Sequence, residues 1–478
     1  MRYSSSRTWR MITSRLASRH SAHGGHALIY LDNVQLRGYC ARVDVCVRRL
    51  PRDCMTLVAL VHRTHTVLAQ HLPVTPFPAR PSCFLGHPPG KPHRVKEHVV
   101  KKFVFTAVAC VTAVSSAMIA VPASAVEIPT LGGPTVLASG LFLPLSLGVG
   151  AGGKVYVSQN ALGALTRISP DGTTSVIARA NPGDELGAVS VRNGTVYYST
   201  NTQDHTASAL YSLPLDGVAA PIADLYAYES AANPDQVNSY GFVDLPQSCL
   251  DQFDPAAPTA PVSYVGIVDT HPYASLPLED AVYVADAGAN AILKVGYDGT
   301  VSTAAVLPAG DPIMVTPQIA AGAGFPACTA CFGYRFEPVP TDVEQSGDGW
   351  LYVTTLPGGP EDASLGARGA VYRFNPADGE VQFVQGGFVG ATGLAVSKRT
   401  GLIAVTELFG GPKGTGQVSV FHPTLTDRTL QIPVTSPSAI ELVGNSAYVT
   451  TNSFVAGATG APQAIGKVVK LSVSLGGD

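Results

Sequence analysis

The chain has 478 residues, enough for one large domain or several small ones, and its charge is unevenly distributed. Residues 1–98 hold 15 Lys and Arg against 4 Asp and Glu, whereas residues 126–478 hold 14 against 30, a net charge of −16. A net charge of this sign repels a phosphate backbone, which excludes nucleic acid as a partner of residues 126–478.

The first 98 residues are rich in Arg, His, Pro and Ser and show no sustained apolar period of 2 or 3.6 residues. A segment without such a period cannot build a core, so we expect residues 1–98 to be disordered if they are made. We favour the interpretation that they are not part of the natural protein. Val99 or Val100 would then be the true start, read as Met.

A secretory signal peptide is predicted over residues 99–125. Lys101 and Lys102 form its basic region, residues 103–121 its apolar region, and the sequence ASA ending at Ala125 its cleavage site. The apolar run is also long enough for a membrane anchor with a cytoplasmic tail. The small-x-small ending and the lack of charges after it favour cleavage, so we expect a secreted, extracellular protein with no membrane span after processing.

Six segments of residues 126–478 repeat one pattern, a short apolar strand that ends in a small residue. They are KVYVS at 154–158, TVYYS at 195–199, AVYVA at 281–285, WLYVT at 350–354, LIAVT at 402–406 and SAYVT at 446–450. Five have tyrosine at the second apolar position, and the segment at 402–406 has Ala404 instead. Runs of β-branched and aromatic residues of this length predict β-strands.

Each segment is followed by a second strand-like run, and four units then reach an Asp-Gly turn, as in YDG at 297–299. Asp-Gly favours tight hairpins because both residues can adopt a positive φ. Further runs before and after give four short antiparallel strands per unit at a spacing of roughly 40–50 residues, which is typical of β-propellers. The sequence therefore predicts an all-β, six-bladed β-propeller of four-stranded antiparallel blades over 126–478, with insertions near 227–263 and 308–340.

The two ends of the propeller region complement each other. The last unit ends in KVVKLSVSLGGD and supplies three strands, whereas GPTVLASG at 133–140 is an isolated strand-like run. We expect this N-terminal strand to complete the last blade, because closure in this way hides an open sheet edge.

These repeats resemble those of NHL-like propellers, and in particular of the exported ScyD/ScyE family. The stretches that carry the resemblance are VYVADAGANAILKVGYDGTVSTAAVLP at 282–308, VPTDVEQSGDGWLYVT at 339–354 and GARGAVYRFNPADG at 366–379. The resemblance covers essentially all of 126–478 and implies a secreted six-bladed propeller. It supplies no catalytic residues, and the missing tyrosine at Ala404 and the loose run at 269–280 depart from the pattern.

The stretch DAGAN at 286–290 has two interpretations. Asp286 can accept backbone amides within its own turn and Asn290 tolerates a left-handed backbone, which makes the stretch a structural turn. Its position gives the functional interpretation, because the loops after the second strands share one face of a propeller. One polar residue per blade lies at that point, and we predict a binding ring there of Asn160, Asn201, Asp286, Thr355, Glu407 and Asn452.

Oxygen atoms in such a ring suit Ca²⁺, and Asp286 and Glu407 are its two carboxylates. We expect no required cofactor, with calcium at Asp286 and Glu407 as the alternative. The histidines of the propeller region, His205, His271 and His422, lie in no recognisable Ser-His-Asp setting, and there is no G-x-S-x-G motif. His271 precedes a proline, so we interpret it as a turn residue.

Both insertions leave from connections between blades and should cover the same face, either as a binding surface or as plain solvated loops. They carry three cysteines, and export favours a disulfide. We expect Cys249 to pair with Cys328 or Cys331, which would join the two insertions; a Cys328–Cys331 pair is the competing arrangement.

We therefore expect a monomeric binding or scaffolding module for an unknown small molecule, glycan or protein on the loop-covered face. The alternative is a calcium-dependent, lactonase-like hydrolase or lyase with its site in the central channel.

Overall fold

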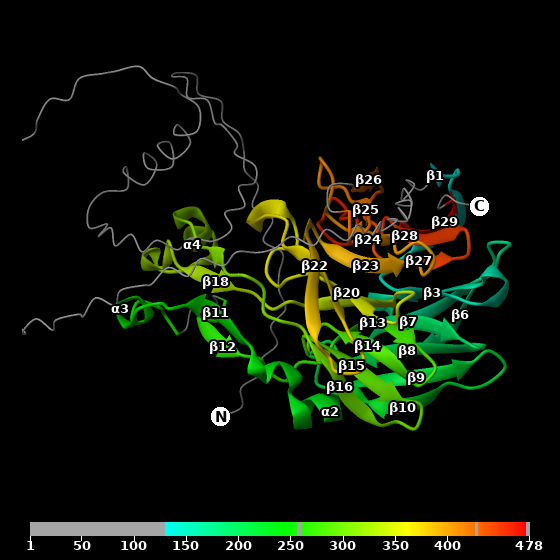
Figure 1. The fold of residues 1–478 in the computed structure, drawn as a ribbon, viewed down its shortest axis with the longest axis horizontal. Helices are drawn as coiled ribbons and strands as arrows, with labels where there is room; N and C mark the ends of the chain where they lie inside the picture. Colours follow the sequence, from blue (N-terminus) through cyan, green and yellow to red (C-terminus); the bar gives the residue numbers. More distant parts are fainter. Residues whose placement is uncertain (1–129, 256–259, 426–428, 475–478) are drawn as a thin grey trace, which may run out of the picture. The chain divides into compact units, whose positions relative to one another are not determined.

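The computed structural model describes residues 130–255, 260–425 and 429–474, which form seven β-sheets and a few short helices (Figure 1). The extension over 1–98, the signal segment over 99–125 and its cleavage point at Ala125 lie outside these residues. No helix in the described part of the chain is long and apolar enough to cross a membrane.

Five of the sheets share one plan, in which four antiparallel strands pair in chain order, and a sixth follows the same plan with its outer edge supplied from the other end of the described chain. Sheet I contains β3 (Leu147–Val149), β4 (Val155–Gln159), β5 (Ala164–Ile168) and β6 (Thr174–Arg179). Sheet II contains β7 (Glu185–Arg192), β8 (Thr195–Asn201), β9 (Ser208–Pro214) and β10 (Ala220–Asp224). Sheet III contains β13 (Pro272–Pro277), β14 (Ala281–Asp286), β15 (Ala291–Gly296) and β16 (Val301–Val306).

The C-terminal half of the chain continues the plan. Sheet IV contains β19 (Pro340–Gln345), β20 (Leu351–Thr355), β21 (Gly369–Phe374) and β22 (Val381–Phe388). Sheet V contains β23 (Ala391–Val396), β24 (Ile403–Glu407), β25 (Gln417–Phe421) and β26 (Leu430–Pro433). Sheet VI contains β27 (Ile440–Val443), β28 (Ser446–Thr451) and β29 (Gly466–Ser474), together with β1 (Thr130–Leu131) and β2 (Thr135–Leu141) from the other end of the described chain.

The predicted closure of the last sheet is confirmed. Strand β2 pairs antiparallel with β29, so that Thr135 lies opposite Lys470 and Ser139 opposite Lys467. Strand β1 continues along the same edge, where Leu131 lies opposite Val473. The N-terminal strand therefore covers an edge of sheet VI that would otherwise be open.

The first strands of the six sheets contact one another in a closed cyclic order, β3, β7, β13, β19, β23, β27 and back to β3. Each neighbouring pair of sheets is also joined by a hydrogen bond in or beside these strands. The bonds are Val189 N to Ser146 Oγ, Ser190 Oγ to Ser275 Oγ, Val339 N to Asn290 Oδ1, Thr341 Oγ1 to Ala391 O, Thr392 Oγ1 to Ser438 O and Ser438 Oγ to Leu145 O. Short antiparallel sheets arranged radially in this way form a β-propeller, so the predicted fold class is confirmed.

Glycine allows the first strands to approach closely. A Cβ atom added at Gly187 of β7 would lie 2.2 Å from the carbonyl oxygen of Pro272 at the start of β13. The same is true of Gly393 in β23, where a Cβ would lie 2.3 Å from the carbonyl oxygen of Ser438. Any larger residue would push neighbouring sheets apart at these two points.

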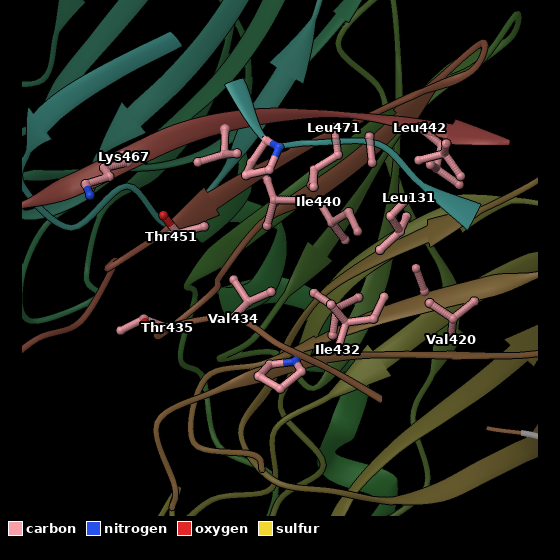
Figure 2. Close-up of a pocket in the computed structure, with 18 of the residues that line it drawn as sticks. Leu131, Val420, Ile432, Val434, Thr435, Ile440, Leu442, Thr451, Lys467 and Leu471 are labelled. Carbon is pink, nitrogen blue, oxygen red and sulfur yellow. The ribbon is translucent and has the colours of Figure 1, made fainter. Parts of the chain in front are cut away.

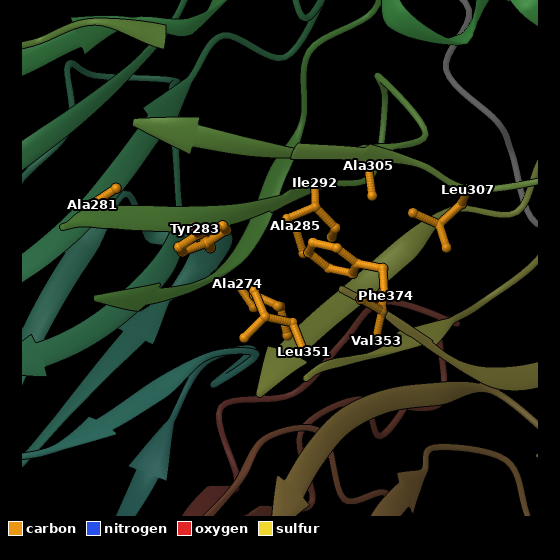
Figure 3. Close-up of a cluster of buried hydrophobic side chains, with 11 residues drawn as sticks. Ala274, Ala281, Tyr283, Ala285, Ile292, Ala305, Leu307, Leu351, Val353 and Phe374 are labelled. Atoms are coloured by element: carbon orange, nitrogen blue, oxygen red, sulfur yellow. The ribbon is translucent and has the colours of Figure 1, made fainter. Parts of the chain in front are cut away.

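The repeated tyrosines of the second strands fill the spaces between sheets. Tyr283 of β14, for example, lies in a buried cluster with Ile292 of its own sheet and with Leu351 and Phe374 of sheet IV (Figure 3). The tyrosines that pack in this way against the following sheet are Tyr156, Tyr197, Tyr283, Tyr352 and Tyr448. Ala404 has their position in sheet V and faces sheet VI.

The two insertions form one further sheet, which the sequence analysis did not predict. Strands β12 (Ser263–Val265), β11 (Ser239–Val243), β18 (Gly333–Arg335) and β17 (Ile313–Met314) pair in that order. The helices of the insertions are α2 (Leu225–Ala232), η3 (Pro234–Val237), α3 (Gln247–Leu250), α4 (Pro317–Ala323) and η4 (Ala327–Thr329). The remaining short helices are η1 (Ala151–Gly153), η2 (Asn160–Leu162) and η5 (Ala363–Leu365).

A disulfide ties the two insertions together, as predicted. Cys249 and Cys328 are bonded, with their Cα atoms 5.7 Å apart, and Cys331 is a free, exposed thiol. An aromatic cluster of Phe242, Phe325 and Tyr334 supports the same sheet with ring centroids 5.0–5.7 Å apart. The insertion sheet therefore has a small core of its own.

Candidate functional site

Four titratable side chains converge at one end of sheets II and III. Glu185 opens β7, His205 lies in the turn between β8 and β9, and Asp269 and His271 precede β13. These segments all lie on the connection side of the propeller, where the loop after a second strand meets the loop that enters the next sheet. His205 has a φ of 56° there, in the left-handed region that few side chains adopt.

Each of the two histidines is paired with a carboxylate. The Nδ1 atom of His205 lies 2.6 Å from Asp269 Oδ1, and Nε2 of His271 lies 3.1 Å from Glu185 Oε2. The two imidazole rings stack, with centroids 4.4 Å apart and an interplanar angle of 25°. The four side chains, which we call the histidine–carboxylate site, are between 23 and 40 % exposed, so solvent and small molecules reach them.

The pairing changes the proton affinity of both partners. Burial lowers the pKa of His205, but the hydrogen bond to Asp269 and the negative charge of that carboxylate outweigh it, so the pKa is raised. Burial raises the pKa of Glu185, but the hydrogen bond and charge of His271 outweigh it, so the pKa is lowered. Glu185 is therefore a carboxylate at neutral pH, and the protonated form of His205 is stabilised.

Three more carboxyl groups lie buried close to this site. Glu229 of α2 and Asp286 of β14 are 0 % exposed and Asp235 of η3 is 1 % exposed. Within the described residues, no group forms a well-oriented hydrogen bond with Oε1 or Oε2 of Glu229, Oδ1 of Asp235 or Oδ2 of Asp286. Buried polar atoms without partners are rare in folded proteins, so they mark a place that needs an explanation beyond stability.

Burial raises the pKa of Glu229 to about 8, and the charges of Asp286 and Asp235 add to the effect. Burial also raises the pKa of Asp286 to about 6, although the His271 and Ala289 amides bonded to it act in the opposite direction. Carboxyl groups that titrate near neutrality are typical of acid–base sites.

The insertions supply the remaining polar groups. Asp235 Oδ2 accepts hydrogen bonds from Tyr240 OH at 3.1 Å and from Asn290 Nδ2 at 2.9 Å. Tyr264 OH donates to Glu337 Oε1 at 2.9 Å, and burial raises the pKa of Glu337 to about 7. The negative charges of Asp235 and Asp269 act on Glu337 as well, so the carboxyl groups influence one another.

The six residues of the predicted ring lie where their second strands end. Thr355 and Glu407 bond within their own sheets, whereas Asn160 Nδ2 donates to the carbonyl of Leu186 in sheet II at 3.4 Å. All except Asn452 are less than 9 % exposed: Asn160, Asn201, Asp286, Thr355 and Glu407. Asn452 has a φ of 54°. Thr355 Oγ1 donates to the carbonyl of Ala370 in the neighbouring strand.

Asp286 and Asn290 fold the turn that the DAGAN stretch indicates. Asp286 Oδ1 accepts from the amides of His271, Gly288 and Ala289 at 2.6, 3.2 and 3.2 Å. Asn290 has a φ of 51°. The same aspartate contributes its other, unpartnered oxygen to the buried carboxyl cluster, so the turn and the site share a residue.

The structure does not unite Asp286 and Glu407 at one ion. Glu407 Oε1 accepts from Gln417 Nε2 at 2.7 Å and from Ser419 Oγ at 2.5 Å, and Oε2 accepts from the amide of Val389 at 2.8 Å. The two carboxylates belong to sheets III and V, with sheet IV between them. Across 130–255, 260–425 and 429–474, no group of three or more His, Cys, Asp or Glu is arranged to hold a metal ion.

A second acidic cluster lies on the first strands. Burial raises the pKa values of Asp342 and Glu344 in β19 and of Glu441 in β27. The charge of Asp342 raises the pKa values of Glu344 and Glu441 further, and the charge of Glu441 also acts on Glu344. Asp342 Oδ2 accepts from the amide of Leu394 at 2.7 Å, and so joins sheets IV and V. Tyr273 OH lies 3.3 Å from Ser438 Oγ and links sheet III to sheet VI, so the innermost strands are also connected across the ring.

The sequence analysis missed the histidine–carboxylate site. His271 was interpreted as a turn residue, and His205, Asp269, Glu185 and Glu229 were not selected. A usable signal existed, because two of the three histidines of residues 126–478 lie in loops that the predicted topology places at one end of adjacent sheets.

No protein-family model and no curated protein matches the chain. Solved structures with a similar arrangement include virginiamycin B lyase from Staphylococcus aureus, at 13 % identity and a TM-score of 0.39, covering 72 % of this chain and 99 % of that one. A PQQ-bound aldose sugar dehydrogenase from Streptomyces coelicolor has 12 % identity and a TM-score of 0.43, covering 73 % and 99 %. A gluconolactonase from Xanthomonas campestris has 12 % identity and a TM-score of 0.43, covering 71 % and 89 %. At this level of similarity no activity is transferred, and the site has to be interpreted from its own geometry.

Proposed function

We propose that this protein is an acid–base enzyme of the hydrolase or lyase class, acting on a small neutral or cationic polar substrate at the histidine–carboxylate site. The observation that carries the proposal is the stacked pair of imidazoles, each within hydrogen-bond distance of a carboxylate and each partly exposed. Histidine dyads of this kind, beside carboxyl groups that titrate near pH 7, are the groups that enzymes use for proton transfer.

The two histidines have complementary roles. In neutral His271 the Nε2 proton is held by Glu185, which leaves the Nδ1 lone pair to take a proton from the substrate or from water. His205, whose pKa is raised by Asp269, gives a proton to the leaving group through its other ring nitrogen. Glu185 and Asp269 act as positioning residues that fix the ring orientations.

The charge around the site indicates the substrate class. Glu185, Asp269 and Asp286 place negative charge on His205, and Asp269 also acts on Glu229 and Glu337 beyond them. An anionic substrate is repelled by this field, whereas a cationic or hydroxyl-rich one is attracted.

A panel of neutral, cationic and anionic esters and lactones tests the proposal, with His205→Gln, His271→Gln and the matched control His422→Gln. Within the described residues the His422 ring hydrogen-bonds to Thr424, two residues away, so its replacement should leave turnover unchanged. We expect each of the other two to lower kcat/KM by roughly 100-fold or more. Asp269→Asn should move the alkaline limb of the pH profile to lower pH, because it removes the charge that raises the pKa of His205. Turnover that is unaffected by His271→Gln, or no turnover of any member of the panel, would count against the enzyme.

A binding or scaffolding role of the ScyD/ScyE type is the second candidate, favoured by apolar residues exposed on the insertion sheet and beside it. Val265, Ile267 and Met314 are 54, 56 and 60 % exposed. Such residues suit a protein or glycan partner on the loop-covered face. Replacing Val265 and Ile267 by Asp should abolish partner capture without changing ester turnover, which separates this role from the enzyme.

We also propose that the protein acts outside the cell, after cleavage at Ala125. The basic, apolar and small-residue order of residues 99–125 supports export, as does the disulfide between Cys249 and Cys328. The mass of the N-terminal peptide of the secreted protein tests this, and a chain that begins at Val126 is expected.

A further inference from the structure

Sheet V lacks the tyrosine that fills the space to the next sheet in every other sheet of the propeller. Its place is taken by Ala404 in β24, whose methyl group leaves the volume of a phenol ring unfilled. The result is a cavity of about 370 Å³ between sheets V and VI (Figure 2). Its size falls within the range of small-molecule pockets, roughly 300–1,000 Å³.

The walls of this inter-sheet cavity are aliphatic. Val418 and Ile432 face it from sheet V, and Ile440, Val449 and Leu471 face it from sheet VI. Strand alternation explains the composition, because every second residue of β29 points to this side while those between, such as Val468, pack toward sheet I. Concave sites with mostly apolar walls of this kind take up ligands with an apolar body.

One end of the cavity is polar. Lys467 lies there with Thr435 and Thr451, whereas Leu442 and Val420 lie at the other end (Figure 2). Lys467 shares the inward face of β29 with Leu471, and its ammonium is the one charge among the lining residues, which contain no carboxylate. A cation whose neighbours in the lining are apolar or uncharged favours an anionic group, because the low dielectric strengthens the attraction.

We infer that the inter-sheet cavity binds an amphipathic small molecule with an apolar body and one anionic head, of the chemical type of a medium-chain carboxylate. The head lies at Lys467 and the chain extends between Ala404 and Leu442 toward Val420. This site is separate from the histidine–carboxylate site, whose acidic surroundings repel the same ligand, so either proposal can fail without the other.

Calorimetric titration of the full chain with decanoate tests the charge requirement, with decyltrimethylammonium as the oppositely charged probe. We expect one decanoate per chain and binding at least tenfold weaker for the cationic probe. Lys467→Gln should weaken decanoate about tenfold. The matched control is Lys470→Gln on the same strand, whose ammonium lies 5.5 Å from the Tyr448 ring centroid and does not line the cavity; it should leave affinity unchanged.

Ala404→Tyr tests the cavity itself, because it gives sheet V the residue that the other five sheets have. We expect it to abolish decanoate binding and to raise the melting temperature by filling the space. If that variant does not fold, Ala447→Leu fills the cavity from the opposite wall.

Three outcomes would overturn the inference. The first is no decanoate binding by the unmodified chain at millimolar concentration. The second is equal decanoate affinity in the unmodified chain and in both filled variants. The third is equal affinity for the two probes, which would remove the role of Lys467.

Discussion

Replacing Glu229 by Gln is expected to stabilise the protein in alkaline solution and to leave it unchanged in acid. Glu229 is fully buried in α2, and Asp286, Asp235 and Asp269 place negative charge around it. Its pKa is therefore raised from 4.5 to about 8. Gln has the same shape but no charge, so the substitution isolates the ionisation.

The sign of the effect follows from proton linkage. Because the folded state holds its proton more tightly than the unfolded state, stability is fully present below pH 4.5 and falls as the pH rises toward 8. The difference between the pKa values of 4.5 and about 8 sets an upper limit of about 5 kcal/mol on the free energy of unfolding that is lost. Relaxation of the site and entry of water reduce it, and we expect roughly 2–3 kcal/mol, which corresponds to a few degrees in melting temperature for a domain of this size.

Melting curves between pH 4.5 and 9 measure the effect for both proteins. The difference between Glu229→Gln and the unmodified chain should be close to zero at pH 4.5, grow steadily, and level off near pH 8. Glu380→Gln, at an exposed glutamate of the turn before β22, is the matched control and should follow the unmodified chain at every pH. Parallel curves for Glu229→Gln and the unmodified chain would refute the assignment of a buried, neutral Glu229.

Three further substitutions test the architecture by thermal and chemical unfolding. Gly187→Ala should lower the free energy of unfolding by roughly 1–3 kcal/mol or more, because its Cβ would lie 2.2 Å from the Pro272 carbonyl oxygen. An unchanged melting temperature would mean that β7 and β13 are not so close. Ala138→Asp, buried in the closing strand, should cost about 3 kcal/mol, whereas Val136→Asp on the same strand, 54 % exposed, should cost little; equal effects would place β2 elsewhere. Cys249→Ser opens a loop of 79 residues and should cost up to about 4.5 kcal/mol, seen first as proteolysis of the insertion sheet; an unaltered digestion pattern would contradict this.

Most of the fold follows from local sequence patterns. The apolar segments at 195–199 and 281–285 lie within β8 (Thr195–Asn201) and β14 (Ala281–Asp286), because short runs of β-branched and aromatic residues favour strands, and these two strands are buried on both faces. The pairing of β2 with β29 was predictable as well, since the last unit was one strand short. The sequence favoured a bond from Cys249 to Cys328 or Cys331 over a Cys328–Cys331 pair, and the structure has the bond between Cys249 and Cys328.

The candidate site was not predictable in this way. His205 and Asp269 are 64 residues apart, and His271 and Glu185 are 86 apart, so neither pair forms a local motif. The propeller brings them together through the packing of β7 against β13, which no short-range pattern encodes. The insertion sheet was not predicted either, because its strands are short and come from two segments that are distant in the sequence.

The pairing of β2 with β29 has a kinetic consequence for the newborn polypeptide. The first two described strands, β1 and β2, both pair with the last one, β29. The ring of sheets therefore closes only after β29 has been synthesised. Until then an unpaired edge stays open, and contacts so remote in sequence form slowly. We therefore expect the nascent propeller to remain incompletely folded on the ribosome and to fold cooperatively once the last strand has been made.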